Sequence, residues 1–270
     1  MPSAPIVAFV VWFAYLLLAV WLLLGRRRPH ARPDQRQRLE HLLLGLLLAL
    51  HAPLVFYPLL GPVPHFGARE ALTQLTWLAT LIYWSAAFLI RLEGLQTILV
   101  PVAAASLGLC LLLPPGHPTP HLARPLTQMH FAIAMLSYGF LAVAAGLAVL
   151  MRLADRALHD PAHGLWRQLP PLLALERLLF TTLTLGFVLL TATLLTGIWF
   201  GEQLFGAVPG LGHKAIFSLA AWLIFAVLLW GRHRHGWRGK LAVNWTLAGF
   251  TVMLLAYVGS RFVVETLLRR

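Results

Sequence analysis

Long apolar stretches alternate with short polar segments along the whole chain. A helix needs about 20 apolar residues to cross the hydrocarbon layer of a bilayer, and eight stretches reach or approach that length. Each is expected to be helical, because the bilayer interior offers no water to hydrogen-bond an open backbone. The predicted spans are residues 5–24, 41–60, 71–90, 97–113, 128–151, 178–200, 215–231 and 241–262. The pattern therefore predicts an all-α fold, a polytopic membrane helix bundle of about eight transmembrane helices, with residues 1–270 forming a single transmembrane domain.

The Lys and Arg residues lie between the spans and are shared unequally between the two sides of the membrane. Fifteen of the 21 fall in one set of loops, which begins with Arg26, Arg27 and Arg28 after the first span. Loops rich in Lys and Arg stay in the cytoplasm by the positive-inside rule. An even number of crossings then places both ends of the chain outside, N-out and C-out. We therefore expect a multi-pass protein of a bacterial inner (plasma) membrane.

The composition supports a membrane environment and argues against other classes of protein. Hydrophobic residues make up 59% of the chain and charged residues 11%, too few charges to cover a soluble surface. The formal net charge of +12 is spread over loops rather than gathered in a basic domain. The lipid bilayer is therefore the expected partner, and nucleic acid is not. The one cysteine, Cys110, excludes redox chemistry by an internal dithiol pair.

The spans contain almost no Asp, Glu, Lys or Arg, which argues against an ion-coupled carrier with carboxylates near the midplane. Histidine is the ionisable side chain that remains, and His51 lies deepest. It is about eleven residues beyond Glu40, hence roughly 16 Å along the second span and slightly outward of the bilayer middle. A neutral imidazole there could ligate a haem iron through one ring nitrogen. The alternative is a histidine that hydrogen-bonds a neighbouring helix.

Three further histidines are candidate ligands on the outer side. His130 lies at the outer mouth of the fifth span, ahead of a helix face of small residues that suits close helix packing. Its alternative interpretation is an interfacial histidine solvated by lipid headgroups. His65 lies in the outer loop before the third span. His213 lies beside Lys214 at the outer end of the seventh, where a purely structural role is the alternative.

Several segments together resemble the cytochrome c assembly membrane protein family, which includes CcsA-like, CcmC-like and HemX-like proteins. Residues 129–139 (MHFAIAMLSYG) are similar to the family's span with an outer haem-ligating histidine. Residues 65–77 (HFGAREALTQLTW) resemble the loop and span that open the family's core. Residues 214–226 (KAIFSLAAWLIFA) resemble the helix that follows its tryptophan-rich haem platform. The resemblance extends over residues 60–270 and is greatest to the shorter HemX-like and YpjD-like branch.

The resemblance implies haem as the cofactor and His130 as a ligand carried over by position. The family's tryptophan-rich outer segment corresponds here to residues 199–206 (WFGEQLFG), which are shorter and poor in tryptophan. The family's other ligand histidines fall opposite Trp230 and near Ser260, so His130 is the one with a direct counterpart. A low-spin haem takes two axial ligands. The partner of His130 would then be His51, His65 or His213, and His130 and His51 are the principal candidates to bind the iron.

The sequence is compatible with two main functions. The first is a haem-handling or cytochrome c assembly protein, by haem binding or by regulation of haem supply, with a reduced outer haem site. The alternative is a haem-free membrane scaffold or accessory partner of another membrane protein, which the missing tryptophan platform favours. A small-molecule or lipid carrier is disfavoured because the chain has no internal repeat. We expect no enzymatic activity, since the sequence has no nucleophile–base pair and no metal-ligand spacing.

Overall fold

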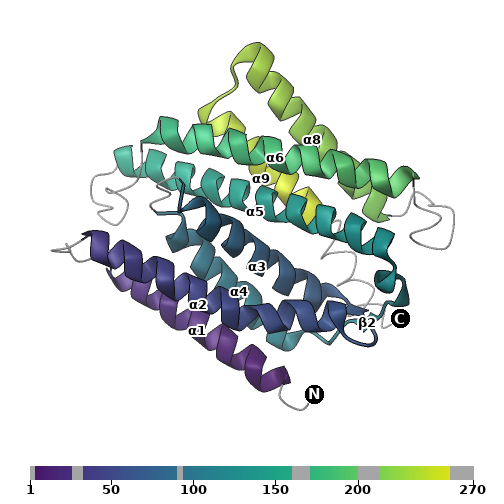
Figure 1. Cartoon of the computed structure of the whole chain (residues 1–270). Coiled ribbons are helices and arrows are strands. Elements are labelled where there is room, and N and C mark those ends of the chain that lie inside the picture. The colour runs from purple at the N-terminus through teal and green to yellow at the C-terminus, as the bar shows by residue number, and fades with distance from the viewer. Residues whose placement is uncertain (1–3, 26–32, 90–93, 160–170, 200–212, 256–270) are drawn as a thin grey trace.

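Helices make up most of the part of the chain that the structure describes. The computed structural model describes residues 4–25, 33–89, 94–159, 171–199 and 213–255. In these ranges eight long helices follow one another, and each occupies one predicted span, so the all-α helix bundle is confirmed (Figure 1). Their bounds are α1 Ala4–Gly25, α2 Pro33–Leu60, α3 Ala68–Ala86, α4 Gln96–Leu112, α5 Pro125–His159, α6 Leu172–Trp199, α8 His213–His235 and α9 Gly239–Leu254.

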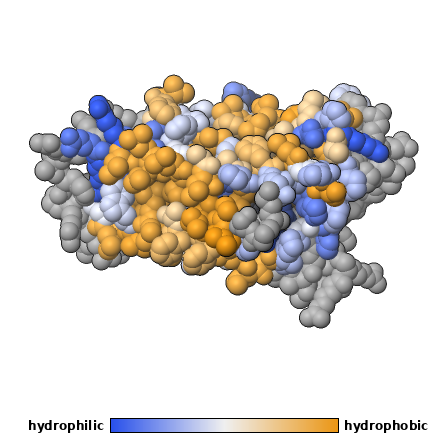
Figure 2. Space-filling view, turned by 60° about the horizontal axis from the view of Figure 1, so that its bottom comes forward, coloured by the Kyte–Doolittle hydropathy of each residue, from blue (hydrophilic) through white to orange (hydrophobic). Residues whose placement is uncertain are grey.

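The helices have the length and surface of membrane spans. Five of the described helices (α1, α2, α5, α6 and α8) are long and apolar enough to cross a membrane, and α4 is a shorter apolar helix. Many large apolar side chains are exposed on them. On the face drawn in Figure 2, hydrophobic residues cover the middle of the molecule and hydrophilic residues gather toward its two ends. This distribution suits a protein surrounded by lipid, where apolar side chains need no cover.

Helix α5 is the centre of the bundle. In the apolar stretch of α5, 72% of the residues are buried, compared with 28% in the corresponding stretches of α1 and α6. It packs against α3 and α4 on one side and against α6 and α9 on the other, so α1–α4 form one layer and α6, α8 and α9 another (Figure 1). Small residues allow this close packing. Gly139 of α5 faces Leu78 and Ile82 of α3, and Gly186 of α6 faces Leu141 of α5.

Polar contacts tie the helix ends together at the arginine-rich end of the bundle. Arg36 at the start of α2 donates to the carbonyl of Gly25, the last residue of α1, at 2.8 Å. Arg36 also pairs with Glu40 at 2.7 Å. Nζ of Lys240 in α9 lies 3.7 Å from the carboxylate of Asp155 in α5. The basic residues that predict orientation therefore also hold neighbouring helix ends.

Two short strands and a helical turn form the opposite end. Strand β1 (His65–Phe66) pairs antiparallel with β2 (His117–Pro118), and the 3-10 helix η1 (Pro120–Ala123) follows. Backbone N–H of Thr119 donates to the carbonyl of Pro64 at 2.7 Å. The two loops rich in Pro and Gly, before α3 and after α4, are thereby joined into one unit.

Several predicted boundaries are corrected by the structure. Helix α2 begins at Pro33, eight residues before the predicted 41, and α5 extends beyond 128–151 at both ends. Hydropathy finds only the stretch that lipid surrounds, whereas a helix continues into the polar layer when its charged side chains pair, as in the first turns of α2. Helix α9 ends at Leu254, and residues 256–262 of the last predicted span lie outside the described residues. The N-out, C-out orientation stays a prediction.

Candidate functional site

His130 lies one turn into α5, half-buried against α6. Its Nδ1 is 2.8 Å from the Thr196 hydroxyl of α6. That hydroxyl lies 2.9 Å from the carbonyl of Ala192 in its own helix, to which it donates its single proton. When the hydroxyl proton stays on its own helix, His130 Nδ1 donates to Thr196 and the lone pair of the neutral ring lies on Nε2. Haem and metal-ligating histidines are commonly oriented in this way, with the second nitrogen donating to a fixed oxygen.

The start of α5 is fixed to the strand end of the molecule by its next residue. The ring of Phe131 meets Phe66 of β1 edge to face, with centroids 4.8 Å apart. Both belong to, or pack against, a small apolar cluster with Leu122 of η1 and Ala71 of α3. His65 precedes Phe66 directly. The structure therefore brings His65 and His130 to the same end of the bundle.

His65 is exposed, with its Nδ1 2.6 Å from the carbonyl of Val63. Glu70 in the first turn of α3 is buried and accepts the backbone N–H of Gly116 at 3.1 and 3.2 Å. A Cβ at Gly116 would lie 2.4 Å from the backbone nitrogen of Gly67, so only glycine permits this approach. A buried carboxylate thus holds the loop of Gly116, and the strand that follows Gly116 pairs with the strand of His65.

His51 occupies a different position, on α2 against α1. Its ring is fully buried, and Nδ1 lies 3.3 Å from the hydroxyl of Tyr15. The two rings meet edge to face at 5.6 Å. Nε2 is buried and meets no hydrogen-bonding partner among the described residues. This is the hydrogen bond to a neighbouring helix that the alternative interpretation predicted, yet it leaves one nitrogen unsatisfied.

The structure does not bring His51 and His130 together. His51 bonds to α1 and His130 to α6, and these helices belong to the opposite layers of the bundle (Figure 1). His213 is the first residue of α8, and its side chain lies outside the described residues, as does most of the segment after Trp199 that corresponds to the tryptophan platform. A single iron therefore cannot take both principal candidates in this conformation.

The imidazoles fit haem ligation better than a bare metal site. Each of His51 and His130 has Nδ1 held by a hydroxyl of a neighbouring helix, the kind of contact that orients haem-ligating imidazoles. Within the described ranges, no group of three or more His, Cys, Asp or Glu could hold a metal ion. His130 is the more accessible of the two, because its ring is only partly buried while that of His51 is fully enclosed.

Sequence reasoning missed a buried amide on the other side of α5. Gln74 of α3 lines an apolar cavity of about 320 Å³ between α2, α3 and α5, together with Trp77, Phe131 and Met135. Both of its amide atoms are buried, and neither has a partner in the part of the chain described. In the sequence, Gln74 is recognisable only as a polar residue within the third predicted span. The sequence does not show whether such a glutamine is hydrogen-bonded or unsatisfied.

Comparison with known proteins agrees with the resemblance. A family described as cytochrome C assembly protein matches residues 65–268. The chain is 31% identical over 203 residues to Inner membrane protein YpjD of Escherichia coli (strain K12), covering 74% of this chain and 76% of that one. It is 26% identical over 261 residues to Cytochrome c biogenesis protein CcsA of Chlamydomonas reinhardtii, covering 93% and 71%. The family match includes His65 and His130, whereas His51 precedes it.

Proposed function

The chain belongs to the cytochrome C assembly protein family, and on that premise we propose that it handles haem at the outer half of the membrane, with His130 as the iron ligand. It is a multi-pass protein of a bacterial inner membrane. Membership of the family gives it a haem-related role in cytochrome c assembly. The proposed site is at the N-terminal end of α5, which the positive-inside rule places on the outer side of the membrane.

The observation that carries the proposal is the hydrogen bond between His130 and Thr196. A threonine that donates to its own helix accepts from the imidazole, and this arrangement favours the tautomer with the lone pair on Nε2. An interfacial histidine solvated by headgroups would need no such fixed partner. His130 also lies inside the region that matches the family, unlike His51.

The residues around His130 have separable tasks. Thr196 sets the ring tautomer and angle, and the contact between Phe131 and Phe66 holds the start of α5 against the loop of His65. When bound, haem would supply an iron that the imidazole of His130 would hold. His65 lies at the same end and would be the candidate second ligand, since its exposed loop position leaves it accessible.

The test is the absorption spectrum of the purified full-length protein after haem reconstitution. We expect a Soret band in the wild type, a loss of most of it in His130→Ala, and its retention in His51→Ala. His233→Ala is the matched control, because His233 is exposed at the opposite end of the bundle. A band unchanged by His130→Ala would refute the assignment. Absence of any band, with a colourless protein partner co-purifying, would favour the haem-free scaffold instead.

A further inference from the structure

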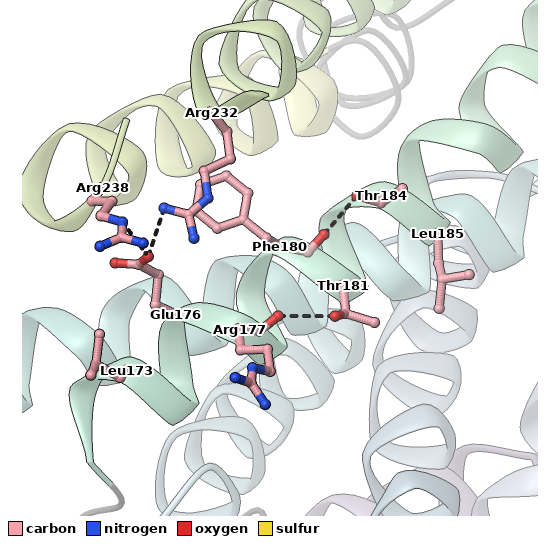
Figure 3. A pocket seen from close by; sticks show the side chains of 9 residues that line it. All are labelled: Leu173, Glu176, Arg177, Phe180, Thr181, Thr184, Leu185, Arg232 and Arg238. Carbon is pink, nitrogen blue, oxygen red and sulfur yellow. Dashed lines mark hydrogen bonds and ion pairs between the residues drawn. The ribbon is translucent and has the colours of Figure 1, made fainter. Parts of the chain in front are cut away.

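A second cavity lies at the arginine-rich end, far from His130. It measures about 560 Å³ and lies between the start of α6 and the junction of α8 with α9. Three arginines line it, Arg177 from α6, Arg232 from α8 and Arg238 from the turn before α9, together with one acid, Glu176 (Figure 3). The haem proposal uses none of these residues.

One carboxylate pairs with two of the three guanidinium groups, closely with Arg232 and more loosely with the exposed Arg238. Oε1 of Glu176 lies 2.8 Å from Arg232 and 3.5 Å from Arg238. The guanidinium of Arg232 also lies over the ring of Phe180, 4.6 Å from its centroid. Arg177 lines the same cavity, but its side chain points away from the Glu176 carboxylate and is exposed (Figure 3). The lining therefore carries two positive charges in excess, with guanidinium donors that one carboxylate cannot satisfy.

The α6 wall of the cavity also carries exposed leucines, one turn before Arg177 and two turns after it. Leu173 is 72% exposed and Leu185 48% exposed. Leu185 is two turns beyond Arg177 on α6, roughly 12 Å along the helix axis. The hydroxyls of Thr181 and Thr184 donate to carbonyls of their own helix, so the arginines are the polar groups that recognise a ligand. A cavity with arginines at one end and exposed leucines along its wall suits a ligand with a charged headgroup and an apolar chain better than it suits a dissolved ion.

We propose that this cavity binds the phosphate headgroup of an anionic phospholipid, with an acyl chain lying along α6 past Leu185. Arg177 and Arg238 contact the phosphate, and Glu176 holds Arg232 in place beneath them. Basic pockets between transmembrane helices on the cytoplasmic side are suited to such headgroups, and each arginine near the membrane surface strengthens the attraction. The bound lipid would join α6 to α8 and α9 at a place where Glu176 pairs with both Arg232 and Arg238.

Native mass spectrometry of the delipidated full-length protein tests this site with three probes. We expect added phosphatidylglycerol to bind as one tight molecule, phosphatidylcholine to bind weakly, and inorganic phosphate to give no retained adduct. The double variant Arg177→Gln with Arg238→Gln, which leaves the Arg232–Glu176 pair intact, should weaken phosphatidylglycerol binding about tenfold or more, given roughly a few-fold per arginine. Arg177→Gln alone should give a smaller loss, and it serves if the double variant does not fold.

The matched control is Arg152→Gln with Arg234→Gln, which removes the same charge from exposed arginines that do not line the cavity. It should retain phosphatidylglycerol binding. Equal binding of phosphatidylcholine would overturn the proposal, because the arginines would then have no role. Equal loss in the control would show general surface attraction. A phosphate adduct as tight as that of the lipid would show a dissolved-anion site.

Discussion

At the scale of single residues, the hydrogen bonds of buried side chains predict which substitutions change stability. Gln96 of α4 is fully bonded: its amide oxygen accepts from Tyr83 and from the backbone of Gly94, and its nitrogen donates to Glu40. Gln74, one helix earlier, has the same side chain with neither amide atom bonded within the described residues. An unsatisfied buried polar group costs about 1–3 kcal/mol, so identical side chains should have opposite effects on stability.

The two glutamines give a direct comparison. Gln74→Met removes two unpaired polar atoms at similar volume and should raise the free energy of unfolding by about 1–3 kcal/mol. Gln96→Met removes the hydrogen bonds that the amide makes with Tyr83, Gly94 and Glu40 and should lower it by about 2 kcal/mol or more, although Arg36 still pairs with Glu40. Thermal unfolding of both variants in one detergent measures the difference. A Gln74→Met protein that melts as early as Gln96→Met would show that Gln74 has a bonded role.

At the scale of helices, the junction of α5 with α6 positions the candidate ligand. Ser137 of α5 donates to the carbonyl of Gly186 in α6 at 2.9 Å, deep in the bundle. Some ten residues further along α6, Thr196 meets His130. The close packing of α6 on α5 therefore determines how far Thr196 lies from the imidazole of His130. The packing depends on Gly186, because a Cβ there would lie 2.7 Å from Cγ of the fully buried Leu141.

Two glycines of α6 separate packing from helix propensity. Gly186→Ala should destabilise the protein by about 1–3 kcal/mol, since Leu141 has no space into which to move. Gly197→Ala is the control, because its Cβ would meet Cε1 of His130 at an ordinary 3.5 Å. It should be neutral or stabilise by up to about 1 kcal/mol through helix propensity. Melting temperatures of both variants in detergent measure the difference. Equal effects of the two changes would show that Gly186 is not required for close packing of α6 on α5.

At the scale of the whole molecule, α5 separates two layers that differ in polar chemistry. The layer of α1–α4 encloses His51 and the Gln74 cavity, and the layer of α6, α8 and α9 meets His130 and the arginine cavity. In the proposed orientation the haem ligand lies outside and the lipid site inside. The two proposed activities are thus at opposite ends of α6, and a change at one should leave the other intact.

The sequence predicts the helices well because a bilayer imposes a simple rule of length and polarity. It does not predict which helices become neighbours, so the partners of His51 and His130 could not be foreseen. Tyr15 and Thr196 are distant in sequence and ordinary in type. The pairing of Glu70 with Gly116 is hidden for the same reason, because loop contacts follow from the fold and not from hydropathy.

The central claim is that the imidazole of His130 is itself the iron ligand, and rescue by free imidazole tests it most directly. His130→Gly should lose the Soret band of reconstituted protein, and added imidazole should restore it by occupying the space left by the ring. His51→Gly with and without imidazole is the parallel control and should keep its band throughout. Recovery in His130→Gly alone is the predicted result. A band that His130→Gly never loses, or that imidazole never restores, would contradict the account.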